Sequence, residues 1–342
     1  MVHSYSVRLV PRPLPARPSL LPTPHHPVRA DVRRTWLTVT RCGSTLARCP
    51  LVPRSYPPRT TPFGPTFVGH GSQLLGAARP SPAARSSLAP TCGAMKSCNT
   101  LSMSDLRVSE IWRYPIKSVG GERVSVATVT ELGVLGDRSW GIFDVDTGTV
   151  LTARRTPELL FASAALTGAD VAITLPDGTV ISSANETCNQ QLSSWLNRKV
   201  ELLAAGEEGG TYEVPLDFEN DENWVSWQGP GGAWHDSKAS RVSLVSRDTM
   251  CDWDQRRFRA NVILDGSGED GLVGAHVSLG TTELAVMKPI DRCVIVTRPQ
   301  PGLDRDLDVL RTINAERATT LSVGALVVTE GTISQGDAVT SV

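Results

Sequence analysis

Short apolar stretches separated by turn signals fill the chain from residue 103 to residue 342, and this pattern constrains the fold more than any other feature. Alternating or β-branched residues typical of strands occur in "LRVSEIW", "RVSVATVTE", "RANVILDG", "HVSLGTTELAV" and "ALVVTEGTIS". Residues 138–154 are expected to form a hairpin with its turn at residues 146–148, and residues 171–183 a second hairpin around residues 176–178. The sequence therefore predicts a barrel or two packed β subdomains.

Helical patterns are few, which makes the predicted fold class mainly β with a few helices (α+β). Residues 188–198 place Leu192, Trp195 and Leu196 on one face of a helix. A second helix is expected to begin after the N-cap residue Ser246 and to run through "RDTMCDWDQRRF", and a third covers residues 306–317. The acidic stretch "PLDFENDENWVSWQGPGGAWHD" is expected to be a loop that joins two halves, residues 103–215 and 216–342.

Residues 1–102 differ in composition from the rest of the chain. They contain 12 arginines, one lysine, one acidic residue and 16 of the 24 prolines, which gives a net charge of +12. Residues 103–342, by contrast, have a net charge of −13. Prolines interrupt helices and central strands, and the segment has too few apolar residues to bury a core. We therefore predict that residues 1–102 are disordered.

Three interpretations of this Arg/Pro-rich segment stay open. The one we favour is a start-site artefact, with translation beginning at Met95 or Met103. A targeting peptide would suit the Arg- and Ser-rich composition, but the prolines would break its amphipathic helix. A basic tail for nucleic acid is the third, although the arginines are scattered and are not interleaved with aromatic residues. The favoured interpretation predicts a cytoplasmic protein without a nucleic-acid partner, and organelle targeting is the alternative.

Apolar runs and cysteines limit the other classes. No apolar run approaches the roughly 20 residues that a membrane span requires. Residues 103–342 contain three cysteines at positions 188, 251 and 293, and this odd, widely spaced set argues against a disulfide framework and favours a reducing compartment. The chain has no glycine pattern typical of a nucleotide-binding loop.

Cationic and small polar residues gather at the predicted strand ends. Four stretches carry them, and "TARRTPEL" adds Arg154: "YPIKSVGGE", "LGDRSWGIFD", "RRFRANVILDG" and "PIDRCVIVT". Taken singly, an arginine at a strand end is usually a solvated surface charge. Cys293 within "CVIVT" is by itself typical of a buried strand, because free cysteine is among the most buried residue types.

Taken together, these stretches and the C-terminal "GTISQGDAV" resemble the MOSC-domain proteins. The resemblance is to the branch with an N-terminal MOSC-type β-barrel subdomain, which includes the mitochondrial amidoxime-reducing component and its bacterial counterparts. It runs from about Val108 to the C-terminus and does not include residues 1–102. It implies a MOSC-type β-barrel core plus an N-terminal MOSC-type β-barrel subdomain, the latter at 103–215 and the MOSC domain at 216–342.

The resemblance also implies a molybdenum cofactor, a pterin dithiolene with a phosphate tail. By motif position, the residues that would bind it are Lys117, Ser118, Arg138, Ser240, Arg259, Asn261 and Arg292. Arginine and lysine suit an anionic phosphate, and serine and asparagine can complete its hydrogen bonds. The chain departs from the family at Ala239, where a hydroxyl residue is common, and at Leu326, where eukaryotic members often have tyrosine.

Cys293 falls where the family has its protein ligand to molybdenum. A thiol bound to a metal is deprotonated, and the neighbouring Arg292 would favour the charged thiolate. The apolar residues after Cys293 are expected to form the strand that fixes this thiolate. Asp291 and His235 are the candidate proton donors nearest to the motif, and Asp291 and Cys293 are the predicted catalytic residues.

The implied activity is the two-electron reduction of small N-hydroxylated compounds. Three cysteines in residues 103–342 are too few for a four-Cys [2Fe–2S] cluster, so electrons are expected from a separate ferredoxin- or cytochrome-like protein. The alternative is a sulfur-carrier, sulfurase-type or cofactor-delivery module without turnover. Family sulfurases combine the MOSC domain with a pyridoxal-phosphate-binding half, and this chain has no second region of that size.

Overall fold

The computed structural model describes residues 106–215 and 224–342. Within them, strands far outnumber helices, so the prediction of a mainly β fold with a few helices is confirmed. The predictions for residues 1–102 lie outside the described residues. No helix among the described residues is long and apolar enough to cross a membrane.

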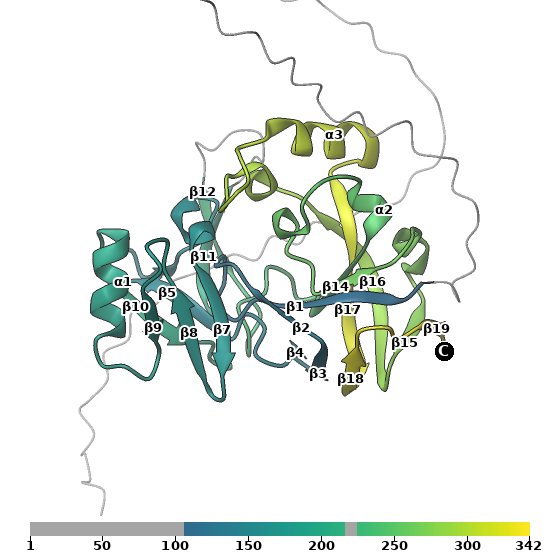
Figure 1. Ribbon diagram of the computed structural model, residues 1–342, viewed down its shortest axis with the longest axis horizontal. Coiled ribbons are helices and arrows are strands. Elements are labelled where there is room, and N and C mark those ends of the chain that lie inside the picture. The colour runs from purple at the N-terminus through teal and green to yellow at the C-terminus, as the bar shows by residue number, and fades with distance from the viewer. Residues whose placement is uncertain (1–105, 216–223) are drawn as a thin grey trace, which may run out of the picture. The chain divides into compact units, whose positions relative to one another are not determined.

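The largest sheet draws its strands from both ends of the described chain. Its spatial order is β19-β15-β16-β17-β13-β14-β1-β2, and only the β13–β14 pair is parallel. Figure 1 shows β1 lying alongside strands that follow it by more than a hundred residues. The bounds are β1 (Val108–Arg113), β2 (Glu122–Val124), β13 (Val242–Ser246), β14 (Val262–Leu264), β15 (His276–Leu279), β16 (Thr282–Asp291), β17 (Thr320–Thr329) and β19 (Val339–Ser341).

A three-stranded sheet extends this mixing of early and late strands. It has the order β18-β3-β4, with β3 (Val126–Thr130), β4 (Gly133–Val134) and β18 (Gly331–Ser334). The first hydrophobic core therefore contains Val108 and Val129 beside Leu284 and Val323, all fully buried. Alternation explains this burial, because every second residue of β16 from Thr282 to Val286 faces the same side of the sheet.

A second core lies under smaller sheets formed by the middle of the chain. One sheet has the order β10-β5-β6 and the other β7-β8-β9. Both predicted hairpins are confirmed here, because β5 pairs with β6 and β8 pairs with β9. The bounds are β5 (Trp140–Asp144), β6 (Thr149–Val150), β7 (Ser163–Thr167), β8 (Asp170–Thr174), β9 (Val180–Ser182) and β10 (Val200–Ala204). The fully buried side chains of this core include Ile116, Leu159 and Ile173.

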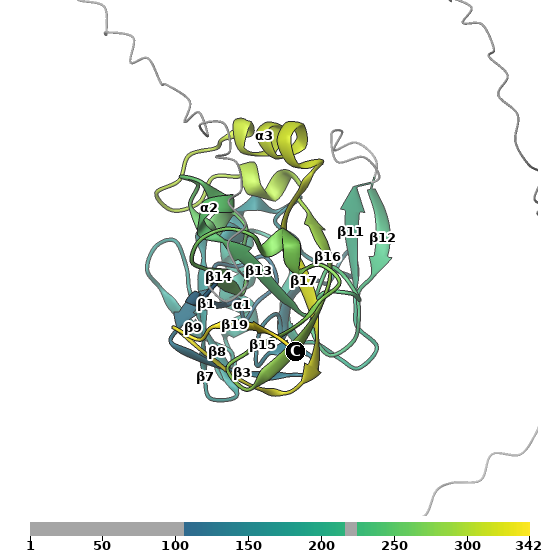
Figure 2. The ribbon, with the colours of Figure 1, turned by 90° about the vertical axis from the view of Figure 1, so that its right-hand side faces the viewer.

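The three α-helices of the described residues lie at or near the predicted positions, but one of them is short. α1 (Cys188–Leu196) buries Leu192 as predicted, and α3 (Leu307–Arg317) begins after Asp306, whose carboxylate accepts a hydrogen bond from the Asp308 N–H. Val309 and Ile313 of α3 are buried in a third core with residues of β13 and β17, and Figure 2 shows α3 above these strands.

The helix predicted after Ser246 is wrong beyond its first turn. α2 (Arg247–Met250) ends at Cys251, which has a φ of 50°. Asp254 then accepts a hydrogen bond from the Arg256 N–H, and this cap starts a separate 3₁₀ turn, η3 (Gln255–Arg257). Three other 3₁₀ turns are described, η2 (Pro157–Phe161), η4 (Glu269–Leu272) and η5 (Val294–Thr297).

The acidic stretch predicted to be a loop contains a hairpin instead. β11 (Thr211–Pro215) pairs in antiparallel fashion with β12 (Trp224–Gln228), so the loop prediction is wrong for residues 224–228. Residues 216–223 lie outside the described residues. Sequence alone hid β12 because acidic residues precede it and glycines follow it, while its stability comes from pairing Tyr212 with Trp227.

Candidate functional site

A cavity of about 350 Å³ is lined by residues from segments far apart in the sequence, from Lys117 to Val296. Its wall contains eight lysines and arginines but only two aspartates, although residues 103–342 as a whole carry a net charge of −13. Low-dielectric walls lined by one sign of charge concentrate the potential, so this cavity favours an anion. The charged residues are Lys117, Arg138, Arg154, Asp236, Arg241, Arg257, Arg259, Lys288, Asp291 and Arg292.

Lys117 is the most deeply buried cation of the cavity wall, with 4% of its surface exposed. Its Nζ donates to the Trp234 carbonyl at 2.9 Å and to the Asp236 carboxylate at 3.0 Å. It also lies 3.9 Å from the centre of the Tyr212 ring, a cation–π contact. Burial lowers the pKa of Lys117 to about 8, even though Asp236 opposes that shift. The ammonium is thus held in place by three groups from two segments that lie far from Lys117 in the sequence.

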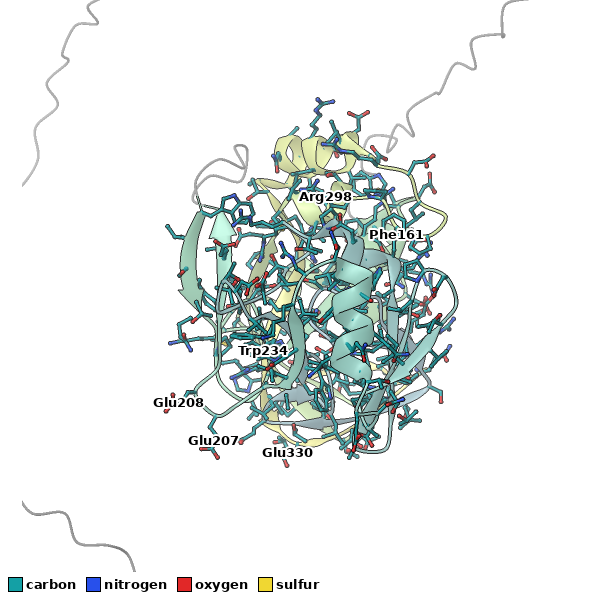
Figure 3. All side chains as sticks on the ribbon, turned by 90° about the vertical axis from the view of Figure 1, so that its left-hand side faces the viewer. Phe161, Glu207, Glu208, Trp234, Arg298 and Glu330 are labelled. Atoms are coloured by element: carbon teal, nitrogen blue, oxygen red, sulfur yellow. The ribbon has the colours of Figure 1, made fainter. Side chains whose placement is uncertain are left out.

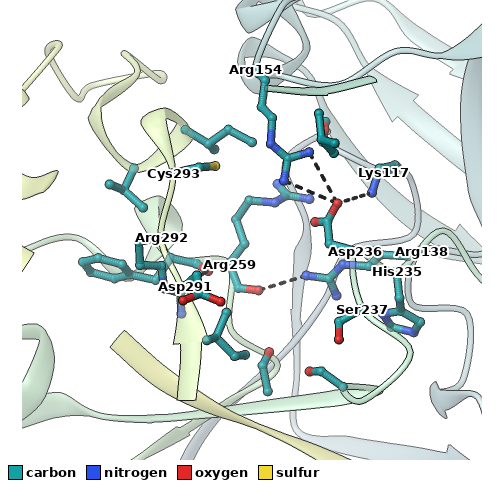
Figure 4. A pocket seen from close by; sticks show the side chains of 18 of the residues that line it. Lys117, Arg138, Arg154, His235, Asp236, Ser237, Arg259, Asp291, Arg292 and Cys293 are labelled. Carbon is teal, nitrogen blue, oxygen red and sulfur yellow. Dashed lines mark hydrogen bonds and ion pairs between the residues drawn. The ribbon is translucent and has the colours of Figure 1, made fainter. Parts of the chain in front are cut away.

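Asp236 is the acid around which the cations of Lys117 and Arg154 gather. The Arg154 guanidinium lies 3.4 Å from the same carboxylate oxygen that Lys117 contacts, and Figure 4 shows both contacts. The protein atoms around the cavity would raise the pKa of Asp236 by displacing part of its water, but Lys117 and Arg154 outweigh this effect and hold that pKa well below its usual range. The side chain keeps 56% of its surface open, so this carboxylate is charged and also accessible from the cavity.

Three of the predicted site residues have left-handed backbone conformations. The φ angles are 66° for Ser118, 52° for Arg138 and 54° for Arg259. Such conformations cost roughly 1–3 kcal/mol each for non-glycine residues and are held only where the surrounding structure fixes them. Bonds between the segments do so here, because the Arg138 N–H donates to the Tyr114 carbonyl and its Nη2 donates to the Arg259 carbonyl at 3.1 Å.

Arg259 combines a fixed position with an unused donor. Its Nη1 donates to the Val119 carbonyl at 2.7 Å and its guanidinium lies 4.4 Å from the Tyr114 ring centre. Its Nη2 is buried and has no hydrogen-bond partner within the described chain. Buried donors normally have partners, so an orphaned guanidinium nitrogen in a cavity wall indicates a place for an acceptor that the protein does not itself supply. Arg154 Nε and Arg241 Nη1 are in the same situation.

Cys293 lines the same cavity as a half-buried free thiol. The prediction that the apolar residues after Cys293 form a strand is wrong: β16 ends at Asp291, and Cys293 is the N-cap of the 3₁₀ turn η5, Val294–Thr297. The turn forms because Val296 leaves the sheet direction to pack into the third core, beside Val309 and Ile313. Burial alone would lower the pKa of Arg154, but Asp236 and then Cys293, which line the same cavity, raise it.

The end of β16 is irregular where it enters the site. Its pairing with β17 shifts between Val286 and Lys288 and again between Pro289 and Asp291. Proline has no N–H to donate to the neighbouring strand, and bulges of this kind redirect side chains at functional sites. Asp291 faces the cavity as an exposed residue and forms an ion pair with Lys288 at 3.6 Å.

Arg292 is bound to protein through all of its guanidinium nitrogens. Its Nε donates to the Leu321 carbonyl and its Nη1 to the Phe258 carbonyl, both at 2.8 Å, and its Nη2 donates to the Ser322 hydroxyl. Although Arg292 lines the cavity as predicted, these bonds fasten the segment before Cys293 to β17 and to the chain before Arg259.

The remaining predicted polar residues are also gathered by the fold. The Asn261 amide accepts from the Ser243 N–H and hydroxyl and donates to the Trp112 carbonyl, so it connects β13 to β1 behind the cavity wall. Ser240 lies at the wall, directly against Gly324 of β17, where a Cβ would approach the Ser240 Oγ to 2.5 Å. All the predicted site residues therefore line one cavity: Lys117, Ser118, Arg138, Ser240, Arg259, Asn261, Asp291, Arg292 and Cys293.

His235 differs from what a proton donor requires. It is 4% exposed, and its Nε2 lies 3.1 Å from the Leu132 carbonyl, to which it can only donate. Burial, with a smaller contribution from Arg138, lowers the pKa of His235 to about 4. The imidazole is therefore neutral near pH 7, with a ring N–H already used within the protein.

Sequence reasoning missed Asp236, Ser237 and the hairpin residues Val214 and Trp227, all of which line the cavity. Asp236 had one physical signal: a buried lysine directly after a strand requires an anionic partner. That partner lies 119 residues away, so no local pattern marks it. Val214 and Trp227 had no signal, since β12 itself was not predicted.

The described residues contain no group of three or more histidine, cysteine, aspartate or glutamate side chains able to hold a metal ion. A metal at Cys293 would therefore need most of its ligands from its own cofactor. The guanidinium nitrogens without partners, the excess of cations and the free thiol are the donor set that an anionic, metal-carrying cofactor would use.

Two family descriptions match the chain. The MOSC N-terminal beta barrel domain matches residues 105–213, and the MOSC domain matches residues 233–340.

Three curated relatives show the same likeness. The mitochondrial amidoxime-reducing component 1 of Mus musculus is 24% identical over 265 residues, 64% of this chain and 74% of that protein. The molybdenum cofactor sulfurase of Danio rerio is 21% identical over 266 residues, 65% of this chain and 32% of that protein. The mitochondrial amidoxime reducing component 2 of Bos taurus is 43% identical over 60 residues, 16% of this chain and 18% of that protein. The chain thus spans about a third or less of the length of two of these relatives.

Proposed function

This chain belongs to the family of MOSC-domain proteins with an N-terminal MOSC-type β-barrel domain, and from that premise we propose that it binds a molybdenum cofactor and reduces N-hydroxylated compounds. The observation that carries the proposal is the cavity itself. It brings a free thiol, eight cations and buried guanidinium nitrogens without partners to one wall, although they come from segments far apart in the sequence.

The cations would hold the anionic part of the cofactor. Arg259 and Arg154 each offer a buried nitrogen that no group of the described residues uses, and an arginine fork suits phosphate oxygens. Lys117 and Arg138 add positive charge whose positions are fixed by Asp236 and Asp137. The hydroxyl groups of Ser118 and Ser240 would complete the hydrogen bonds to the cofactor. In the proposed domain division, Ser118 belongs to the N-terminal domain, residues 103–215, and Ser240 to the MOSC domain, residues 216–342.

Cys293 would be the protein ligand to the metal. Its thiol is at the start of η5 and lines the same cavity as the Arg154 guanidinium. Arg292 and Asn261 would act indirectly, because their polar atoms are bound to neighbouring strands and hold the segments that carry Cys293 and Arg259. We therefore assign these two as positioning residues rather than direct cofactor contacts.

The reaction would consume two electrons and two protons. When bound, the molybdenum cofactor supplies two-electron chemistry, and the protein supplies orientation and charge. The N–O bond of the substrate breaks, one proton goes to the nitrogen, and the hydroxyl oxygen takes the other and leaves as water. Asp291 is the accessible acid nearest to Cys293 in the chain, so it would pass protons from solvent into the cavity. His235 would not, because its ring is neutral and already bonded.

The electrons would come from a separate donor protein. Within residues 106–215 and 224–342 no cysteine cluster exists that could hold an iron–sulfur centre. A ferredoxin- or cytochrome-like partner would meet a chain whose residues 103–342 carry a net charge of −13, which favours a basic docking surface on that partner. We propose a cytoplasmic location for the protein.

A second function is favoured by the likeness to the Danio rerio molybdenum cofactor sulfurase. In that case Cys293 would carry sulfur, or the cavity would hold the cofactor for delivery, without substrate turnover. Both functions need the same cationic cavity, so they differ only in what happens at Cys293 and in whether a substrate is reduced.

Molybdenum content tests the proposal. The chain and its Cys293→Ala variant would be expressed in a host that makes the cofactor and analysed by elemental mass spectrometry, with Cys188→Ala, a buried thiol in α1, as the matched control. We expect the wild type and Cys188→Ala to contain equal molybdenum and Cys293→Ala to lose at least about 90% of it, because a thiolate ligand is removed. Equal molybdenum in all three proteins would refute the ligand assignment.

Turnover then separates enzyme from carrier. Molybdenum-loaded protein with a reduced viologen dye as electron donor should convert benzamidoxime to benzamidine, measured by chromatography. A loaded sample that reduces nothing, together with a persulfide on Cys293 in the mass spectrum, would favour the sulfur-carrier function instead.

A further inference from the structure

One stretch of the cavity wall has no part in holding an anion. It is apolar and comes from three places: Val214 and Trp227 of the β11–β12 hairpin, Ile290, Ile295 and Val296 around Cys293, and Phe258 after η3. The polar wall accounts for the cofactor, whereas an apolar wall in the same cavity provides binding surface for something else. Ligand cavities usually combine a few fixed polar groups with such apolar surface.

The hairpin presents one consistent face to the cavity. Side chains alternate along a strand, so Tyr212 and Val214 share a face of β11, and their cross-strand partners Trp227 and Val225 share that face of β12. The ring of Trp227 lies 5.1 Å from the ring of Tyr212, tilted by 49°. Lys117 lies 3.9 Å from the centre of the same Tyr212 ring. The Trp227 indole, which packs against Tyr212, therefore lies beside the cationic cluster.

The other face of the hairpin is attached to the loop that carries Arg154. Arg155 forms an ion pair with Glu213, and its guanidinium lies 5.1 Å from the Trp224 ring centre. Arg155 directly follows Arg154, whose side chain reaches both Asp236 and the neighbourhood of Cys293. The hairpin and the metal-ligand candidate are thus connected through two adjacent arginines. Figure 3 views the molecule from the left-hand side of Figure 1, with Trp234 of the Tyr212 cluster and Glu207 and Glu208 of the loop before β11 labelled.

We propose that Trp227, with Val214, is the specificity-determining wall of the site and selects N-hydroxylated substrates that carry a planar apolar group. This inference rests on the proposed function and adds the substrate class. The half-buried indole leaves part of its face in the cavity, where an aryl ring can stack in an offset or tilted arrangement. Eight cations in the same wall disfavour a positively charged substituent at this place.

The test compares two ligands with the same reacting group. Benzamidoxime has an aryl ring and acetamidoxime a methyl group, so only the first can use the indole. Their dissociation constants would be measured by calorimetry on molybdenum-loaded, oxidised protein, which requires no turnover. Trp227→Ala should raise the dissociation constant of benzamidoxime about tenfold, because one aromatic contact is lost. The dissociation constant of acetamidoxime should stay within about twofold of that of the wild type. Trp227→Phe should retain most of the affinity.

Trp224→Ala is the matched control, because it removes the same side chain from the opposite face of the same strand. It should leave both ligands unchanged. The inference is overturned if Trp227→Ala weakens both ligands equally, if it weakens neither, or if the wild type binds benzamidoxime no more tightly than acetamidoxime. A wild type that binds benzamidoxime in preference but never reduces it would overturn the proposed reductase activity and leave the wall assignment standing.

Discussion

Arg259 and Arg292 lie in two regions that meet at the same cavity, and they use their guanidinium groups in opposite ways. Burial lowers the pKa of each to about 10, so both remain charged near neutral pH. Arg292, at the end of β16, donates to the Phe258 and Leu321 carbonyls and to Ser322. Arg259, after η3, donates to the Val119 carbonyl alone and leaves Nη2 buried without a partner within the described chain.

This difference distinguishes side chains that stabilise the structure of the site from side chains that have a free hydrogen-bond donor for a ligand. A buried donor without a partner costs free energy that the protein recovers only when an acceptor arrives. Arg292 has no such cost, and Asn261 and His235 resemble it because their polar atoms are bound to carbonyls and neighbouring strands. A position in the cavity wall therefore does not by itself identify a binding residue. A binding residue is identified by a buried nitrogen that has no hydrogen-bond partner among the described residues.

The largest effect on stability should come from Arg292→Met. This change leaves the Phe258 and Leu321 carbonyls buried without their donor, and each such group costs on the order of 1–3 kcal/mol. We expect the free energy of unfolding to fall by about 3 kcal/mol, measured by urea denaturation. Arg292→Lys can restore only part of it, because an ammonium cannot reach three acceptors in fixed directions. A loss below about 1 kcal/mol would mean that the bonds around Cys293 are not structural.

A smaller, pH-dependent effect should come from His235. Its pKa is lowered by burial from 6.5 to about 4, so the unfolded chain takes up a proton before the folded chain does. The stability from the neutral imidazole is therefore complete above pH 6.5 and is lost as the pH falls toward 4, by about 2 kcal/mol at pH 5. His235→Gln keeps a donor for the Leu132 carbonyl and should flatten this part of the curve of unfolding free energy against pH.

His276→Gln provides the control for that curve. His276 is exposed, pairs with Glu283 and does not line the cavity, so its replacement should leave in place the loss of stability that His235 causes between pH 6.5 and 4. If His235→Gln has the wild-type slope, the imidazole is not buried in neutral form, and its exclusion as a proton donor would have to be reconsidered.

Most of the strand pattern could be predicted because it is local. The turns at residues 146–148 and 176–178 and the helix starts after residues 246 and 306 each depend on a few neighbouring residues, and the structure has a turn or a helix start at every one of them. The predictions that failed concern segments whose structure depends on contacts with distant parts of the chain. Residues 294–297 have a strand composition, but Val296 packs beside α3, and that packing turns the backbone into η5. The strand β12 likewise depends on its partner β11.

The residues that line the site could be predicted from the sequence, but the hydrogen bonds and ion pairs between them could not. Motif positions brought forward Lys117, Arg138 and Arg259 as cations for one anion, and the structure places all three on one wall. The division of labour between Arg259 and Arg292 could not be read from the sequence, because both are arginines beside apolar strands. Asp236 was missed because its role depends on Lys117, which lies 119 residues earlier in the chain.

The smallest effect on stability, and the sharpest test of the comparison, should come from Arg259→Met. Only the bond to the Val119 carbonyl is lost, and repulsion from Arg138 is relieved, so the free energy of unfolding should change by about 1 kcal/mol or less. Anion binding should suffer instead. Calorimetry with pyrophosphate on metal-free protein should show affinity about tenfold weaker than that of the wild type, because one charge-assisted bond is removed.

Arg256→Met is the matched control, since Arg256 lies three residues earlier and is already paired with Asp254. It should leave pyrophosphate binding at the wild-type level. If Arg259→Met keeps the wild-type affinity, the buried Nη2 does not face an anion, and if it unfolds as readily as Arg292→Met, the two arginines share one structural role. In the expected outcome, Arg292→Met loses stability and Arg259→Met loses affinity for the anion, because Arg259, unlike Arg292, has a buried nitrogen without a partner among the described residues.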